Sequence, residues 1–202
     1  MARRGRPPGG DAQRRRILAA VMPLVAERGL TAVRLVDVAA ASGVSVGMIQ
    51  HYFRSRDALL DQAFHDYCMT VVERMRTAAG TGDDPWGRVV ALCRAATAST
   101  RMRQRAVTWL DFVNQAARDP RRRRVVQQVY EAWFDALRTV IDDGAREGVF
   151  QLTDDPAVVA EQLVTMVDGL DVAVAMRLRR ADQNWRESRL IGAARALLGV
   201  PA

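Results

Sequence analysis

VRLVDVAAASGVSVGMIQHYF, residues 33–53, is the stretch that decides the fold, because it predicts two short helices joined by a glycine turn. The first helix is expected over about residues 35–41, where apolar side chains recur at the three-and-four spacing of one helical face: Leu35, Val38 and Ala39. Gly43 can take the left-handed backbone conformation that ends a helix and lets the chain turn. Ser45 then begins the second helix, because its hydroxyl can accept a hydrogen bond from a free backbone N–H.

The second predicted helix carries two contrasting faces. At about 100° per residue, its apolar side chains fall on one side, and these are Ile49, Tyr52 and Phe53. The other side carries small and hydrogen-bonding residues: Val46, Gly47, Gln50, His51 and Arg54. A helix in the DNA major groove needs small residues where its backbone approaches DNA, and hydrogen-bonding residues at base edges and phosphates. The pattern therefore favours a DNA-binding helix-turn-helix over an ordinary pair of core helices.

The longer segment GVSVGMIQHYFRSRDALL, residues 43–60, resembles the GVSxGxxxxYFxxKxxLL signature of TetR-family transcriptional regulators. Within that family, GMIQHYF is most similar to the choline-responsive BetI type. The resemblance covers about residues 13–64, and beyond them it rests on helix number and spacing. The chain has Arg34 where the family usually has threonine or serine, and Arg56 where it usually has lysine. Both arginines suit phosphate, but the helix cap at position 34 is expected to be lost.

The resemblance implies which residues contact DNA, and they are Arg34, Ser45, Val46, Gly47, Gln50, His51, Tyr52 and Arg56. The amide of Gln50 is the candidate for base reading, because it can pair with adenine in the major groove. The two arginines, His51 and Tyr52 are expected to hold phosphates.

Charge is distributed unevenly along the 202 residues, which carry a net charge of +7. Residues 1–60 contain ten arginines and four acidic residues, a balance of +6, so the remaining residues carry only +1. A basic N-terminal third on a near-neutral remainder is typical of a nucleic-acid-binding module joined to a second module. With 49% hydrophobic residues, the chain can bury one good core and a second small one.

Several function classes are disfavoured by what the chain contains. Cys68, Cys93 and two histidines are too few for a disulfide framework or zinc site, so no metal or cofactor is expected, although a redox-sensing cysteine stays open. No phosphate-binding loop, nucleophile elbow or paired-histidine motif indicates an enzyme. The longest apolar run, residues 17–26, contains Pro23 and is too short to span a membrane. Without a secretory signal, a soluble cytoplasmic protein is expected.

Helical periodicity continues along the whole chain, and no stretch alternates with period two, so the expected fold is all-α with about nine helices. A first helix over residues 11–28 contains Pro23, which predicts a kink or a later start. Ser55 caps a fourth helix. Asp-Pro pairs at 84–85, 119–120 and 155–156 each predict a helix start. Further helices are expected over residues 85–97, 101–118, 120–146, 156–179 and 185–198.

Three regions follow from these elements. Residues 1–10 are expected to form a flexible basic arm, residues 11–56 the helix-turn-helix domain, and residues 57–202 a helical ligand-binding and dimerisation domain. The arm's Arg3, Arg4 and Arg6 are either DNA contacts or part of a solubilising tail. The arginine run at residues 121–124 is expected to be a solvated face.

Aromatic and thioether side chains in the C-terminal part form either a core stripe or a small-molecule pocket. The candidate pocket residues are Met102, Trp109, Phe112, Tyr130, Trp133 and Met166. Asp168 and Asp171 lie inside an apolar segment, where a carboxylate is costly unless it is paired or exposed. They either have a structural role or favour a cation, so the expected effector is lipophilic or cationic.

A single short recognition helix makes few contacts, so a palindromic double-stranded operator read by a twofold homodimer is expected. The predicted interface is an apolar seam on the last two long helices: Leu163, Val167, Leu170, Val174, Leu190, Ala194 and Leu197. The resemblance implies a repressor that a small molecule releases from its operator. The alternative is a constitutive or architectural DNA-binding dimer without a ligand.

Overall fold

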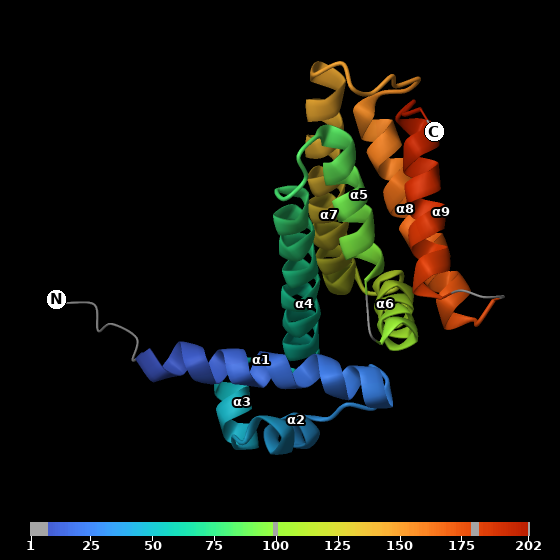
Figure 1. Cartoon of the computed structure of the whole chain (residues 1–202). Helices are drawn as coiled ribbons and strands as arrows, with labels where there is room; N and C mark the ends of the chain where they lie inside the picture. Colours follow the sequence, from blue (N-terminus) through green and yellow to red (C-terminus); the bar gives the residue numbers. More distant parts are fainter. Residues whose placement is uncertain (1–7, 99–100, 179–181, 202) are drawn as a thin grey trace. The chain divides into compact units, whose positions relative to one another are not determined.

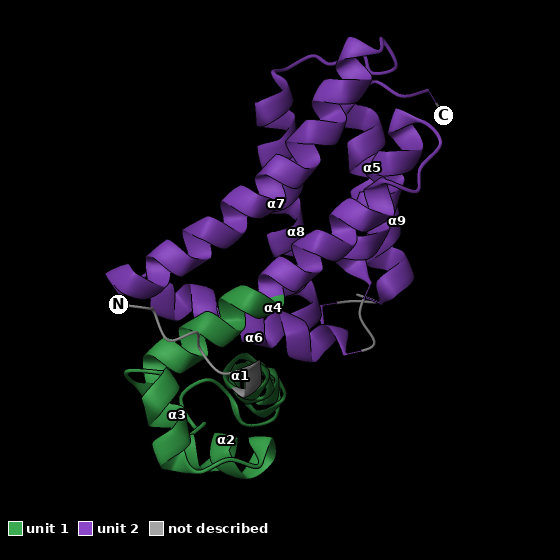
Figure 2. Ribbon diagram, turned by 90° about the vertical axis from the view of Figure 1, so that its left-hand side faces the viewer, with its two compact units in different colours: residues 1–67 green, residues 68–202 purple. Residues whose placement is uncertain are grey.

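The computed structural model describes residues 8–98, 101–178 and 182–201. These residues form nine helices and no strand, which confirms the all-α prediction (Figure 1). The chain divides into two compact units, residues 1–67 and residues 68–202 (Figure 2). The boundary falls inside helix α4 (Arg56–Ala79), later than the expected boundary after residue 56.

The first unit contains α1 (Pro8–Arg28), α2 (Leu35–Ser42), α3 (Val46–Tyr52) and the beginning of α4. Helix α1 begins at Pro8, so residues 8–10, which were assigned to the flexible arm, are helical. The alternative of a later start is also wrong, because α1 continues through Pro23. Arg3, Arg4 and Arg6 lie outside the described residues.

The turn between α2 and α3 has the geometry that the sequence predicted. Gly43 takes a left-handed conformation with φ of 66°, and the Ser45 hydroxyl accepts a hydrogen bond from the Met48 N–H at 3.1 Å. The start of α2 differs from expectation. Arg34 does not cap this helix through its side chain, but its backbone N–H donates to Asp37 Oδ2 at 2.8 Å. The start of α2 therefore keeps the half of a capping box that an acid at the third position supplies.

A compact core holds the first unit together. Its fully buried side chains come from α1, the connection after it, α3 and α4: Ile17, Val21, Val33, Ile49 and Leu59. Ser55 caps α4, because its hydroxyl accepts from the Ala58 N–H at 3.1 Å. Since Ile49 is the buried side chain of α3, the rest of this short helix stays at the surface.

The second unit contains the later part of α4 together with α5 (Pro85–Thr97), α6 (Met102–Ala116), α7 (Pro120–Arg146), α8 (Pro156–Ala175) and α9 (Gln183–Leu197). All three Asp-Pro pairs begin helices as predicted. Their aspartates accept hydrogen bonds from the N–H groups of Gly87 at 2.7 Å, Arg121 at 2.8 Å and Ala157 at 2.8 Å. Asp182 caps α9 in the same way without a following proline, so α9 begins before the predicted residue 185.

The core of the second unit contains most of the seam that was predicted to join two protomers. Six of its seven side chains are at least nine-tenths buried within the single chain, and Leu197 packs against the core: Leu163, Val167, Leu170, Val174, Leu190 and Ala194. These side chains therefore pack inside one protomer, and a dimer interface on the last two helices stays a prediction. Helical periodicity identified an apolar face, but it does not show whether that face packs inside a protomer or against a second copy.

The arginine run at the start of α7 is also not simply a solvated face. Arg122 is buried, and its guanidinium lies 5.6 Å from the centre of the Phe112 ring. Arg123 Nη2 donates to the Ala117 carbonyl at 2.7 Å, at the end of α6. Cation–π contact and capping of free carbonyls thus join α6 to α7.

Candidate functional site

The outer face of α3 presents the polar residues that the sequence assigned to it. Gln50 and His51 are exposed, Gly47 is exposed, and Val46 and Tyr52 are half-buried. Ile49 and Phe53 are buried on the opposite side. Core packing therefore fixes the helix through one face and leaves an amide and an imidazole available to a partner on the other.

Gly47 has no internal reason to be glycine. A Cβ built at this position meets no other atom closer than Ser45 Oγ, at 4.0 Å. Glycine within a helix is less stable than alanine by roughly 0.5–1 kcal/mol. The fold therefore leaves room for a side chain here, and packing within the chain does not account for the glycine.

Arg34 and Arg56 have different surroundings, although the sequence assigned both to phosphates. The Arg34 side chain is 76% exposed and has only Asp37 nearby, with 3.6 Å between Nε and Oδ2. Arg56 Nη1 donates to Asp57 at 2.9 Å, and the other guanidinium nitrogens donate to the carbonyls of Leu30, Thr31 and Val33.

Arg56 therefore joins α4 to the connection between α1 and α2, and it is not a free phosphate ligand. This corrects its assignment. No sequence pattern indicates these bonds, because the carbonyls that accept them lie more than twenty residues earlier in the chain. Among the predicted phosphate ligands, Arg34 and His51 are the ones that the structure leaves exposed.

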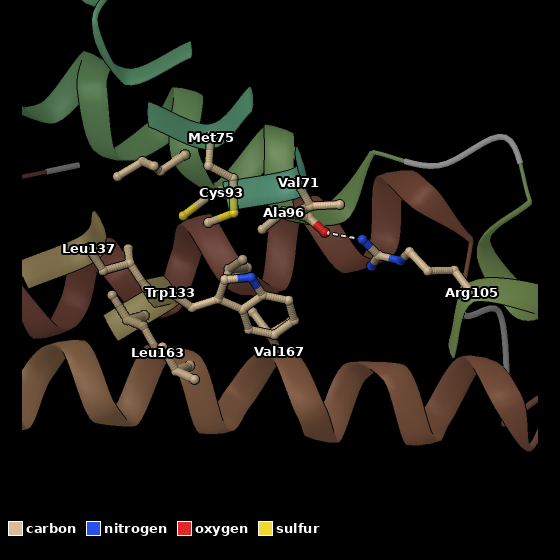
Figure 3. A pocket seen from close by; sticks show the side chains of 12 residues that line it. Val71, Met75, Cys93, Ala96, Arg105, Trp133, Leu137, Leu163 and Val167 are labelled. Carbon is tan, nitrogen blue, oxygen red and sulfur yellow. Dashed lines mark hydrogen bonds between the residues drawn. The ribbon is translucent and has the colours of Figure 1, made fainter. Parts of the chain in front are cut away.

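A narrow cavity lies inside the second unit, and helices α4 to α9 all contribute to its wall (Figure 3). The space that the centre of a water-sized sphere can occupy is about 20 Å³. This is about the room that one water molecule needs. Most of the wall is apolar, including Val71, Met75, Leu137 and Leu163, and Arg105 is the charged residue in it.

Of the six predicted pocket residues, Trp133 alone is among those that line this cavity. Trp109 and Phe112 are buried in the core, while Tyr130 and Met166 pack against it, and Met102 packs against a separate small cluster. The cavity therefore shares only Trp133 with the predicted pocket. The sequence showed where aromatic residues concentrate, but not where their packing leaves space.

Three of the predicted aromatic residues surround Asp168. The ring centres of Trp109 and Trp133 lie 5.1 Å apart in a stacked arrangement, and that of Tyr130 lies 5.4 Å from Trp109. Asp168 accepts hydrogen bonds from Trp109 Nε1 at 2.9 Å and from the Tyr130 hydroxyl. Burial raises the pKa of Asp168, and these two bonds partly oppose that effect. The three rings pack against one another beside Asp168.

Asp171 belongs to a separate buried ionic cluster. Its carboxylate accepts from Arg186 and lies 3.4 Å from Arg105 Nη2. The Arg186 side chain is fully buried and also donates to the Thr97 carbonyl at 3.2 Å. Burial lowers the pKa of Arg186, and Asp171 opposes that effect. A carboxylate in an apolar segment, such as Asp171, needs a partner when it is buried. The sequence does not identify that partner, because it contains twenty arginines beyond residue 60.

The two cysteines are buried side chains rather than exposed thiols. Burial raises the pKa of Cys68 and of Cys93 to about 12 in each case, so both stay protonated at neutral pH. Since the thiolate is the reactive form, this argues against the redox-sensor alternative. In the part of the chain that the structure describes, no group of His, Cys, Asp and Glu is suited to a metal ion. Among those same residues, no helix is long and apolar enough to cross a bilayer.

Two family models match the chain. One, described as bacterial regulatory proteins of the tetR family, matches residues 17–63, and the other, described as the C-terminal part of BetI-type transcriptional repressors, matches residues 85–198. Among curated relatives, the HTH-type transcriptional regulator BetI of Rhizobium meliloti is 26% identical over 166 residues, 82% of this chain and 79% of that protein. The BetI of Cronobacter sakazakii is 25% identical over 170 residues, 81% of this chain and 80% of that protein.

Solved structures show the same fold. A putative TetR-family regulator from Rhodococcus sp. superposes with a TM-score of 0.81 at 23% identity, covering 93% of this chain and 99% of that one. A putative transcriptional regulator from Saccharomonospora viridis, solved in complex with choline, gives 0.78 at 26% identity, with 89% and 94% covered. Since the C-terminal family model alone spans more than half of the sequence, this chain belongs to the TetR family of bacterial transcriptional regulators, with a C-terminal domain of the BetI type.

Proposed function

We propose that this cytoplasmic regulator represses transcription by binding a palindromic operator as a twofold homodimer, and that a small molecule in its second unit releases it. The DNA-binding part of this proposal rests on the outer face of α3. There Gln50 and His51 are exposed beside Gly47, a glycine that the fold does not require. Gln50 reads a base, while Arg34, Ser45, Val46, His51 and Tyr52 contact the DNA around it.

The proposed dimer interface is the opposite face of α8 from the one that the sequence suggested. Six exposed residues follow one another at the three-and-four spacing of a helical stripe: Val158, Gln162, Thr165, Gly169, Val172 and Met176. Val172 is 41% and Met176 is 62% exposed, although both are apolar. A Cβ at Gly169 of α8 or at Gly192 of α9 meets no atom within 4 Å, so the backbones of two such helix pairs can approach closely.

The proposed ligand site is the cavity beside Trp133. This cavity has room for about one water molecule and is too small for a drug-sized or metabolite-sized molecule, so the effector binds a conformation with a wider cavity. Val71 and Met75 of α4 belong to the wall, and Arg56 at the start of the same helix holds the α1–α2 connection. A displacement of α4 therefore connects the ligand site with the DNA-binding unit.

The chemical class of the effector is inferred from the residues that line the cavity and from one structural relative. The apolar lining suits a lipophilic compound, and the structural relative that contains choline supports a quaternary amine as a second candidate. The competing proposal is a constitutive repressor, and the small size of the cavity is the observation that favours it.

A titration separates these two proposals. Labelled DNA from the region upstream of the gene is bound to the protein, and candidate lipophilic and cationic compounds are added while fluorescence polarisation is measured. A ligand-responsive repressor releases the DNA with at least one of them. Unchanged operator affinity across a broad compound set would favour the constitutive repressor.

A further inference from the structure

The wall of the cavity contains hydrogen-bond donors that have no acceptor. Arg105 Nε and Trp133 Nε1 are both buried, and neither has a hydrogen-bond partner among the described residues. Both residues line the cavity, and Figure 3 shows the Arg105 guanidinium reaching it beside Ala96. A buried donor without an acceptor is costly, so these two atoms favour an acceptor inside the cavity.

The ionic cluster that contains Arg105 carries a net positive charge, which also favours a negatively charged acceptor in the cavity. Two guanidinium groups, Arg105 and Arg186, share the carboxylate of Asp171, which leaves one positive charge in excess. The fit of Arg105 to Asp171 is also loose, at 3.4 Å, while its Nη1 donates to the Ala96 carbonyl at 2.9 Å. A water molecule can accept hydrogen bonds, but it brings no charge to balance this excess.

The other acidic residues near the cavity are engaged elsewhere. Both oxygens of Asp168 are engaged, because they accept hydrogen bonds from Trp109 and Tyr130. Glu187 forms its own ion pair with Arg94 at 2.8 Å. The excess charge of the cluster is therefore not cancelled by a neighbouring carboxylate that points at Arg105.

We propose that the effector carries a carboxylate, which binds Arg105 and the Trp133 indole N–H, and that a short aliphatic body fills the apolar remainder of the cavity. Bidentate contact between a guanidinium and a carboxylate is favoured over contact with a neutral acceptor, because both partners are charged and planar. The apolar wall, with Leu137, Leu163 and Met75, suits a saturated hydrocarbon chain. This inference rests on the proposed ligand-binding role of the cavity.

The test compares ligands of one shape and different charge on the protein alone. Isothermal titration calorimetry is run with butanoate, hexanoate, octanoate and decanoate, and then with the primary amide and the primary amine of the best chain length, and with choline. The carboxylate is expected to bind on the order of tenfold more tightly than its amide, which is typical of a charge-assisted contact. Equal binding of acid and amide, preference for the amine or choline, or no binding of any carboxylate would overturn the proposal.

Two variants and a matched control locate the contact. Arg105→Gln removes the charge, and Trp133→Phe keeps a ring but removes the N–H; both are expected to reduce the preference for carboxylate over amide, Arg105→Gln to near unity. Arg103→Gln, on an exposed position of the same helix, should keep the full preference. Circular dichroism checks that each variant is folded, and if Arg105→Gln is not, Trp133→Phe decides. An unchanged preference in a folded Arg105→Gln protein would refute the assignment.

Operator release is measured separately by fluorescence polarisation with the same compounds. A carboxylate that binds the protein but does not release DNA would contradict the proposed release mechanism, while the ligand assignment would stand. Release by choline without any carboxylate binding would support the proposed function and refute this inference.

Discussion

Replacing Gly47 with alanine should change folding stability and DNA binding in opposite directions. The added Cβ meets no atom closer than 4.0 Å, and Gly47 lies inside α3, so the fold accepts it without strain. Alanine is the better helix former by roughly 0.5–1 kcal/mol. For a protein of this size, that gain corresponds to an increase in melting temperature of about 1–4 °C.

Operator affinity of the same variant should fall. If DNA lies against the bare backbone at Gly47, a methyl group forces a shift, and inserting a methyl into a packed contact costs about 1–3 kcal/mol. That cost corresponds to a loss of roughly 5- to 150-fold in affinity, and a homodimer carries the change twice. The expected loss of operator-binding free energy therefore exceeds the expected gain in folding stability. The two effects are measured in different assays.

The assay pairs a thermal melt, followed by circular dichroism, with fluorescence polarisation on operator DNA at fixed salt concentration. Thr77→Ala is the matched control, because Thr77 is exposed on α4 and bonds only to the Glu73 carbonyl in its own helix. It should raise stability by helix propensity and leave operator affinity unchanged. If Gly47→Ala binds the operator as tightly as the parent, the close approach of DNA at this glycine is refuted.

Three other substitutions test the remaining parts of the proposal. Gln50→Ala should lower discrimination at one base pair by about 1–3 kcal/mol with little change in non-specific binding, and an equal loss on all DNA sequences would make Gln50 a backbone contact. Val172→Asp should give monomers in analytical ultracentrifugation and weakened operator binding in fluorescence polarisation. Thr139→Asp, on an exposed face of α7, should remain dimeric. A dimeric Val172→Asp protein would contradict the proposed interface. Gly144→Ala should destabilise the protein by about 3 kcal/mol in urea unfolding, because its Cβ would lie 2.2–2.8 Å from the Phe150 ring, and an unchanged midpoint would contradict that packing.

Local chemistry explains why the helices were predictable from the sequence. The aspartates at positions 84, 119 and 155 and the serines at 45 and 55 act on backbone groups within three residues of themselves. Gly43 likewise acts at its own position, through its positive φ. These interactions are local, so they form in the same way however distant parts of the chain pack. The helix starts therefore agree with prediction to within a few residues.

The predicted sites depended on longer-range packing, and there the sequence was insufficient. Leu163 and Leu190 were correctly identified as members of an apolar face, but that face is buried within one protomer. Arg56 was assigned to DNA phosphates, but the oxygens that its guanidinium contacts are carbonyls of its own chain. In both cases the residue type fixes the kind of partner, and only the fold decides which partner is within reach.

The small size of the cavity bears directly on how release would work. A ligand shifts an equilibrium only by its difference in affinity for the two conformations. The cavity as it stands has room for about one water molecule, so a larger ligand binds almost exclusively to a wider form. Val71 and Met75 of α4 line that cavity, so in the proposed mechanism widening it displaces the helix whose first residue, Arg56, holds the α1–α2 connection. A cavity that is closed in the free protein is therefore compatible with strong coupling, because the ligand would then prefer the wider conformation.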